Sequence, residues 1–144
     1  MSFRFQVTFD AADPERLAAF WGTALGYVEQ EPPEGYESWE KWARSVGIPE
    51  ERWNDAFALV DPDGVRPRLF FQRVPEPKTV KNRVHLDVTV SGDRGVTLDE
   101  RRPRVDAEVE RLVGAGATRL KVNDEADQYW VVMQDPEGNE FCLQ

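Results

Sequence analysis

The sequence is poor in cysteine and in positive charge. Its single cysteine excludes an intramolecular disulfide. Its 18 Lys and Arg are outnumbered by 27 Asp and Glu, and the resulting net charge of −9 argues against binding to nucleic acid or to an anionic membrane. The sequence shows no signal peptide and no hydrophobic run of transmembrane length. We therefore expect a cytoplasmic protein.

Two turn motifs of the same design divide the sequence. Residues 61–64 read Asp-Pro-Asp-Gly and residues 135–138 read Asp-Pro-Glu-Gly. In each, Asp-Pro opens a tight turn and glycine supplies the positive φ that the turn needs. With 40% hydrophobic residues, 144 residues can form one domain or two small halves that share a core. The repeated motif indicates a duplicated unit.

The first half is predicted to contain a helix and four strands. Asp13 is a good N-cap, Pro14 suits the first helical position, and Gly26 ends the helix. The helix therefore lies between these residues. The patterns of alternating apolar residues predict strands at 4–9, 27–30, 56–60 and 68–74.

An aromatic-rich insertion, residues 31–54, interrupts this half. It opens with a Pro- and Gly-containing breaker cluster and then carries Trp39, Trp42 and Trp53 among charged residues. A short helix is expected at 37–46, where Trp39 and Trp42 would share one face. Two interpretations remain open. The tryptophans could anchor the insertion to the sheet, or one of them could roof an aromatic-lined ligand pocket.

The second half repeats the order of the first. A strand is predicted at 82–90, a polar loop at 91–102, and a helix from Pro103 to Gly116. Strands at 118–122, 129–133 and 140–143 follow, with an acidic turn at 123–127. We therefore predict an α+β fold of two βαβββ modules, 1–76 (with the insertion) and 80–144, joined by a stiff proline-rich connector.

Several segments resemble the vicinal oxygen chelate superfamily, which includes glyoxalase I, bleomycin resistance proteins and extradiol dioxygenases. They are residues 13–16 (Asp-Pro-Glu-Arg), 20–21 (Phe-Trp), 25–26 (Leu-Gly), 82–87 (Asn-Arg-Val-His-Leu-Asp), 113–117 (Val-Gly-Ala-Gly-Ala) and 135–143. The similarity is closest to the small glyoxalase-like domains. It implies that each module curls its sheet into a cup and that the cups face each other. In metal-dependent members, the first and last strands of each half hold a divalent cation there.

The resemblance places four residues at the ligand positions: Gln6, Arg68, His85 and Glu140. His85 and Glu140 suit a borderline divalent metal, Gln6 is a weaker neutral oxygen ligand, and Arg68 cannot ligate because it stays cationic. The expected cofactor is therefore either none or one Zn, Ni, Fe or Mn ion. Glu140 is the candidate catalytic residue. It could equally be an ordinary carboxylate paired with Arg68.

Other side chains are candidates for binding. Asp87 shares a strand face with His85, so it could add a carboxylate ligand or fix the histidine tautomer. Trp39, Trp42 and Trp130 could line a ligand pocket, and Arg68 could attract an anionic group. Cys142 is interpreted as a small buried hydrophobe.

Three functions are consistent with the sequence. The first is a glyoxalase-like protein that binds a small organic molecule in the cup between its modules, with a degenerate metal site. The second is a metal-dependent lyase, isomerase or dioxygenase of the glyoxalase I type that uses His85 and Glu140. The third is a structural domain with a filled cup. Exposed sheet edges could also support a homodimer. We favour the first because Gln6 and Arg68 stand where stronger ligands are expected.

Overall fold

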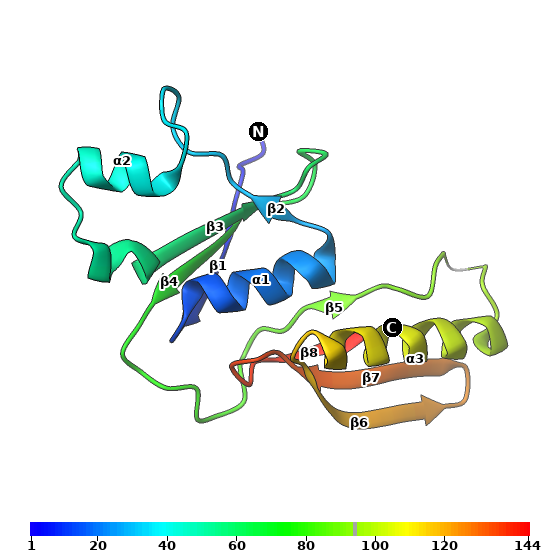
Figure 1. The fold of residues 1–144 in the computed structure, drawn as a ribbon. Coiled ribbons are helices and arrows are strands. Elements are labelled where there is room, and N and C mark those ends of the chain that lie inside the picture. Colours follow the sequence, from blue (N-terminus) through cyan, green and yellow to red (C-terminus); the bar gives the residue numbers. More distant parts are fainter. Residues whose placement is uncertain (94) are drawn as a thin grey trace. The chain divides into compact units, whose positions relative to one another are not determined.

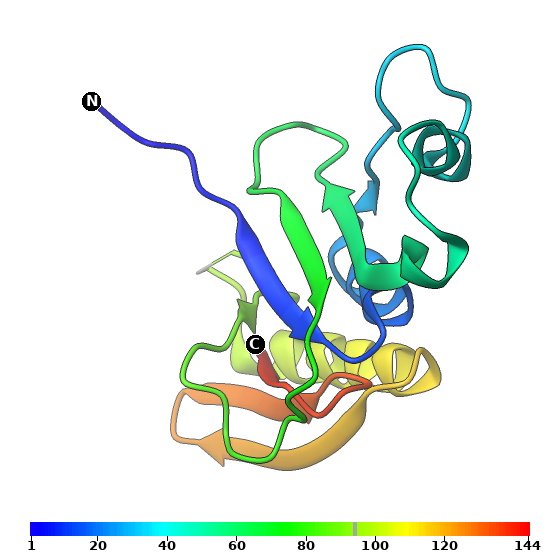
Figure 2. The same cartoon turned by 90° about the vertical axis from the view of Figure 1, so that its left-hand side faces the viewer.

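The computed structural model describes residues 1–93 and 95–144, and the chain divides into two compact units, Met1–Pro77 and Lys78–Gln144. Figures 1 and 2 show their elements. No helix in the described part of the chain is both long and apolar enough to span a bilayer.

The first unit is a four-stranded mixed sheet with one long helix and a two-helix insertion. Its elements are β1 (Val7–Ala11), α1 (Pro14–Leu25), β2 (Val28–Glu29), α2 (Trp39–Ser45), the 3-10 helix η1 (Glu50–Asp55), β3 (Ala56–Val60) and β4 (Leu69–Arg73). The strand order is β1-β4-β3-β2, with β1 parallel to β4 and the other pairs antiparallel. In Figure 2 the insertion lies beyond the β2–β3 edge of this sheet.

Helix α1 forms where the sequence predicts it. Asp13 accepts a hydrogen bond from the backbone N–H of Arg16 (3.2 Å), and Gly26 ends the helix with a φ of 68°. The apolar face of α1 then covers one face of the sheet. There, the ring of Trp21 lies 5.2 Å from Phe9, which stacks on Phe71 at 5.0 Å. These rings form the centre of the first core.

The second unit repeats this arrangement without an insertion. Its elements are β5 (Asp87–Val88), α3 (Leu98–Gly114), β6 (Thr118–Glu125), β7 (Gln128–Gln134) and β8 (Glu140–Leu143). The strand order is β5-β8-β7-β6, again with the outer pair β5–β8 parallel. Buried side chains from α3 pack against buried side chains of β7 and β8: Val105, Val109, Leu112, Val131, Met133, Phe141 and Leu143.

The two Asp-Pro-x-Gly turns share their hydrogen bonds as well as their sequence. Asp61 accepts from the backbone N–H groups of Asp63 (3.4 Å) and Val65 (3.1 Å), and Asp135 accepts from the equivalent groups of Glu137 (2.9 Å) and Asn139 (3.0 Å). Both aspartates are buried. The equal strand order and equal turns confirm the predicted α+β fold of two βαβββ modules.

Three predicted boundaries in the second half are wrong. Helix α3 begins at Leu98, because Thr97 and Glu100 form a capping box, so Pro103 lies inside the helix rather than at its start. Strand β5 covers only Asp87–Val88 of the predicted 82–90. Most of the acidic segment 123–127 belongs to β6, and the turn is centred on Ala126, which has a φ of 44°.

Candidate functional site

The face of the first sheet that points away from α1 carries a guanidinium group held by two amides. Val7 and Phe9 of β1 pair in register with Leu69 and Phe71 of β4 and face the core, so Gln6 and Arg68 point to the other side. Arg68 donates through Nη1 to Oε1 of Gln6 (2.7 Å) and through Nε to Oε1 of Gln30 (2.6 Å). The structure therefore brings the predicted residues Gln6 and Arg68 together.

The guanidinium of Arg68 is positioned by hydrogen bonds, but no carboxylate of the described residues neutralises its charge. Its partners are neutral amide oxygens, and its guanidinium carbon lies 5.1 Å from the centroid of the Phe70 ring. None of the ion pairs among residues 1–93 and 95–144 involves it. Arg66 differs, because it pairs with the buried carboxylate of Asp61 at 2.8 Å. A half-buried cation beside an aromatic ring is suited to receive an anionic group.

In the second unit, His85 lies beside Asp87 and Cys142 rather than in a group with Glu140. Nε2 of His85 is 3.2 Å from Oδ1 of Asp87, and Asp87 is the register partner of Cys142 across β5 and β8. One ligand atom from each of these three residues lies within 4.8 Å of the others. Burial and the neighbouring Asp87 raise the pKa of the Cys142 thiol, while Lys81 acts in the opposite direction.

The carboxylate of Glu140 pairs with a lysine and accepts a hydrogen bond from the backbone. Oε2 of Glu140 lies 3.2 Å from Nζ of Lys78 and accepts a hydrogen bond from the backbone N–H of Asn82 (3.1 Å). Burial raises the pKa of Glu140, but the backbone N–H groups of Asn82 and of Glu140 itself, together with Lys78, outweigh burial, so the pKa is lowered overall. Glu140 is therefore an ionised carboxylate at neutral pH.

The side chain of Asn82 explains why the predicted strand 82–90 is short. Its Oδ1 accepts from the backbone N–H of Glu140 (2.9 Å), and its Nδ2 donates to the carbonyl of Glu140 (3.2 Å). These two bonds take the place of backbone pairing to β8 at this point. The parallel ladder is resumed where Cys142 donates its backbone N–H to Leu86 (2.9 Å).

Of the three tryptophans of the insertion, Trp39 hydrogen-bonds to a residue outside it. Trp39 and Trp42 pack edge to face with centroids 5.5 Å apart, and Nε1 of Trp39 donates to the backbone carbonyl of Gln30 (2.7 Å). Trp53 bonds within the insertion, to the carbonyl of Ile48 (3.0 Å). Since the side chain of Gln30 holds Arg68, the insertion is linked through one residue to the guanidinium. Trp130 lies half-buried on β7, opposite Asn123.

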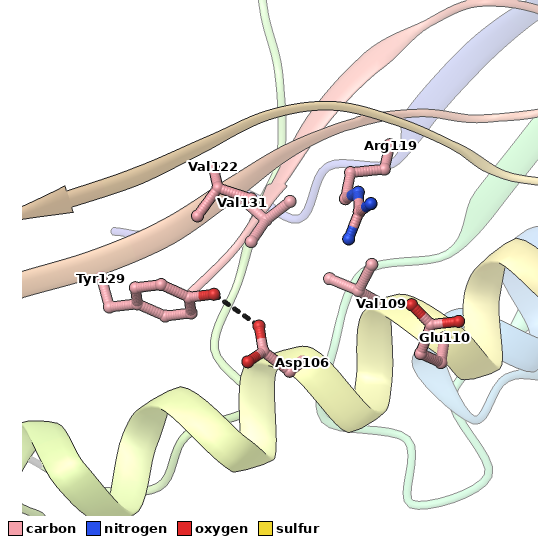
Figure 3. A pocket seen from close by; sticks show the side chains of 7 residues that line it. All are labelled: Asp106, Val109, Glu110, Arg119, Val122, Tyr129 and Val131. Carbon is pink, nitrogen blue, oxygen red and sulfur yellow. Dashed lines mark hydrogen bonds between the residues drawn. The ribbon is translucent and has the colours of Figure 1, made fainter.

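The second unit also contains a shallow cavity of about 300 Å³ on the α3 side of its sheet. Figure 3 shows its lining: Asp106, Val109, Glu110, Arg119, Val122, Tyr129 and Val131. The hydroxyl of Tyr129 donates to Asp106 (2.5 Å). Burial, and then this hydrogen bond, raise the pKa of Tyr129 to about 12. No residue that the sequence singled out for binding lines this cavity.

Sequence reasoning missed Gln30, Lys78 and the position of Cys142 beside His85 and Asp87. Cys142 is half-buried on the face away from α3, since it alternates with the buried residues Phe141 and Leu143. Its interpretation as a buried hydrophobe is therefore wrong, and its two-residue spacing from Glu140 was a usable signal. Nothing in the sequence indicates that Gln30 or Lys78 reaches its distant partner.

The family and the solved structures that this chain resembles agree with the fold described above. The glyoxalase-like domain model matches residues 6–144. None of the curated proteins matches the sequence. An enzyme of the glyoxalase/bleomycin resistance protein/dioxygenase family from Burkholderia phytofirmans PsJN is 20% identical with a TM-score of 0.61, over 96% of this chain and 94% of that one.

Two further structures are fosfomycin resistance proteins. A variant of FosX from Listeria monocytogenes, complexed with Mn(II) and 1S,2S-dihydroxypropylphosphonic acid, is 12% identical with a TM-score of 0.63, over 100% of this chain and 90% of that one. FosX from Mesorhizobium loti is 11% identical with a TM-score of 0.62, over 100% and 91%. Identities this low show the fold alone. Because the domain model spans almost the whole sequence, the chain belongs to the glyoxalase-like domain family, within the vicinal oxygen chelate superfamily.

Proposed function

We propose that this glyoxalase-like domain binds a small organic molecule with an anionic group, and that Arg68 recognises this group directly. The observation that carries the proposal is the Arg68 guanidinium, which two neutral amides orient and which forms no ion pair with any described residue. Such a group is preorganised for a carboxylate, phosphate or phosphonate, because its orientation is already fixed before the ligand arrives.

The surroundings of Arg68 support the same class of ligand. Phe70 offers an apolar surface beside the charge, while Gln6 offers an amide N–H that can donate to a bound oxygen. The net charge of −9 disfavours anions at long range, so the local guanidinium must supply the attraction. A protein of similar fold, a variant of FosX from Listeria monocytogenes, has been crystallised with Mn(II) and a phosphonic acid.

Three of the four residues at the family's metal positions, Gln6, Arg68 and Glu140, do not fit a divalent cation. In the first unit, Oε1 of Gln6 accepts from the guanidinium of Arg68. In the second unit, the carboxylate of Glu140 accepts from Lys78 and from the backbone of Asn82. A metal ion at either residue would have to displace a cationic side chain that is already hydrogen-bonded there. This supports a degenerate family-type site.

The experiment is a binding screen by calorimetry and thermal shift, with small carboxylates and phosphonates compared with their neutral esters, in the presence of EDTA. We expect the anions to bind and Arg68→Gln to weaken them about 10- to 100-fold, the range for a lost hydrogen bond to a charged group. Arg52→Gln, which removes an exposed guanidinium elsewhere in the same unit, is the matched control and should leave affinity unchanged.

The metal-dependent alternative with His85 and Glu140 predicts the reverse pattern. Binding would then be abolished by EDTA and by Glu140→Gln, and Arg68→Gln would have little effect. That result would overturn the proposal.

A further inference from the structure

We infer that His85, Asp87 and Cys142 form a three-ligand site for a borderline divalent transition metal, with Zn²⁺ as the preferred ion. The site lies wholly in the second unit and does not depend on the ligand proposed for Arg68. It shares His85 with the family-type positions but uses Asp87 and Cys142 in place of Gln6 and Glu140.

Strand pairing creates the site. Asp87 and Cys142 are register partners in the parallel pair β5–β8, so their side chains leave the sheet on the same face. His85 precedes Asp87 by two residues and reaches it at 3.2 Å. The imidazole, carboxylate and thiol atoms all lie within 4.8 Å of one another. In a tetrahedral Zn²⁺ site the ligand atoms lie about 2.0–2.3 Å from the metal and therefore closer to one another than 4.8 Å. Small side-chain rotations would bring these three ligand atoms to such positions.

The donor set selects the metal. Thiolate and imidazole favour Zn²⁺ and Co²⁺ over Mg²⁺ and Mn²⁺, which prefer all-oxygen sites. The thiolate and Asp87 together neutralise a divalent charge, and the thiol proton is released to solvent when the metal binds. Three protein ligands leave a fourth position for water or another ligand, which is the arrangement of an open rather than a purely structural zinc site.

The neighbouring carboxylate is committed elsewhere. Glu140 lies two residues before Cys142 on β8, and its oxygens are bonded to Lys78 and Asn82. His85 and Asp87 are by contrast about half exposed, with side-chain exposures of 44% and 50%, and they pair with each other beside the thiol. The available ligand from β8 is therefore Cys142.

The test is Co²⁺ titration of the full-length, metal-free, reduced protein. We expect one Co²⁺ per chain, a near-ultraviolet thiolate-to-cobalt charge-transfer band, visible bands typical of tetrahedral cobalt, and displacement by Zn²⁺. Cys142→Ser should abolish the charge-transfer band and weaken Zn²⁺ binding by at least about tenfold. His85→Ala should weaken Zn²⁺ binding to a similar extent. Glu140→Gln is the matched control on the same strand face and should leave both unchanged.

A second measurement is independent of whether the variants fold. Cys142 is the only thiol in the chain, so Zn²⁺ should protect the unmodified protein from alkylation, and Mg²⁺ should not. Each of four results would overturn the inference. Two concern cobalt: no saturable Co²⁺ binding, or a Co²⁺ spectrum without the thiolate band. The others are alkylation at the same rate with and without Zn²⁺, and loss of metal binding in Glu140→Gln.

Discussion

The guanidinium of Arg68 and the side-chain amide of Gln6 are hydrogen-bonded at 2.7 Å although 62 residues separate them in the sequence. Parallel pairing of β1 with β4 brings them together, and Gln30 from the other edge of the sheet completes the arrangement. The cation is thus fixed by the tertiary fold rather than by its own segment. The role of the two amides can be tested separately from the charge.

Gln6→Ala and Gln30→Ala should each weaken binding of an anionic ligand about 3- to 10-fold, since each removes one hydrogen bond that orients the guanidinium. In double-mutant cycles with Arg68→Gln the effects should be less than additive, because the amides act through Arg68. Calorimetry measures both. Gln72→Ala removes an amide from the same strand face that bonds Asp10 instead, and affinity should not change. Full additivity would contradict the positioning role.

The pH dependence of the first unit should contain a contribution from Asp61. The side-chain hydrogen bond from Arg66, and then backbone N–H groups, hold the pKa of this carboxyl below its ordinary value. A lowered pKa in the folded state stabilises the protein above the unfolded-state pKa of about 3.9, and this contribution is lost as the pH falls toward the folded-state value. Asp61→Asn should therefore lower the Tm at neutral pH.

The difference in Tm between the native protein and Asp61→Asn should shrink as the pH is lowered below about 4, because protonation removes the same charge. Thermal unfolding followed by circular dichroism across this range is the measurement. Asp63→Asn, an exposed aspartate in the same turn, should follow the native curve. A Tm difference that does not vary with pH would show that the charge of Asp61 is not what stabilises the turn.

Trp39 should matter more to the fold than Trp53. Trp39→Phe removes the hydrogen bond to Gln30, which ties the insertion to β2, and should cost about 1 kcal/mol of stability. It should also speed proteolysis within residues 31–54 and weaken anion binding slightly, because Gln30 orients Arg68. Trp53→Phe removes a hydrogen bond inside the insertion, so it should leave anion binding unchanged. Equal effects of both variants on anion binding would rule out the link through Gln30.

The turns and the first helix were predictable because local chemistry determines them. Asp13, Pro14 and Gly26 fix α1 within one segment, and each Asp-Pro-x-Gly turn is built from hydrogen bonds between residues at most five apart. The start of α3 is also determined by local residues, the Thr97–Glu100 capping box. Pro103 is the more conspicuous helix-start signal, so the start was predicted there instead.

The candidate sites were only partly predictable because distant partners determine them. The family resemblance located Gln6, Arg68, His85 and Glu140, whereas the neighbours that decide their chemistry lie 38 to 62 residues away, at Gln30, Lys78 and Asn82. Asn82 ends the β5 pairing with its side chain, which no periodic pattern reveals. Cys142 could have been placed from alternation along β8 alone.

The raised pKa of Tyr129 gives the second unit its own pH signature. Burial, and then the hydrogen bond to Asp106, raise this pKa to about 12. A phenol whose pKa is raised on folding stabilises the protein fully below the unfolded-state value of about 10, and the contribution disappears as the pH rises toward 12. Stability should therefore fall across this alkaline range, and Tyr129→Phe should reduce the fall. Ultraviolet absorbance titration should show that the same variant loses the phenolate that ionises at about pH 12.

Asp106→Asn separates the two causes. It removes the carboxylate but keeps the burial, so the pKa of Tyr129 should drop while staying above about 10. At neutral pH, Tyr129→Phe should cost about 1 kcal/mol, because the lost hydrogen bond to a carboxylate is partly exposed to water. Tyr36→Phe removes an exposed hydroxyl bonded to Ser45 in the first unit and serves as the control, with no effect on the Tyr129 titration. If Asp106→Asn leaves the Tyr129 pKa unchanged, burial alone sets it, and the contact between α3 and β7 contributes no electrostatic stabilisation of the phenol.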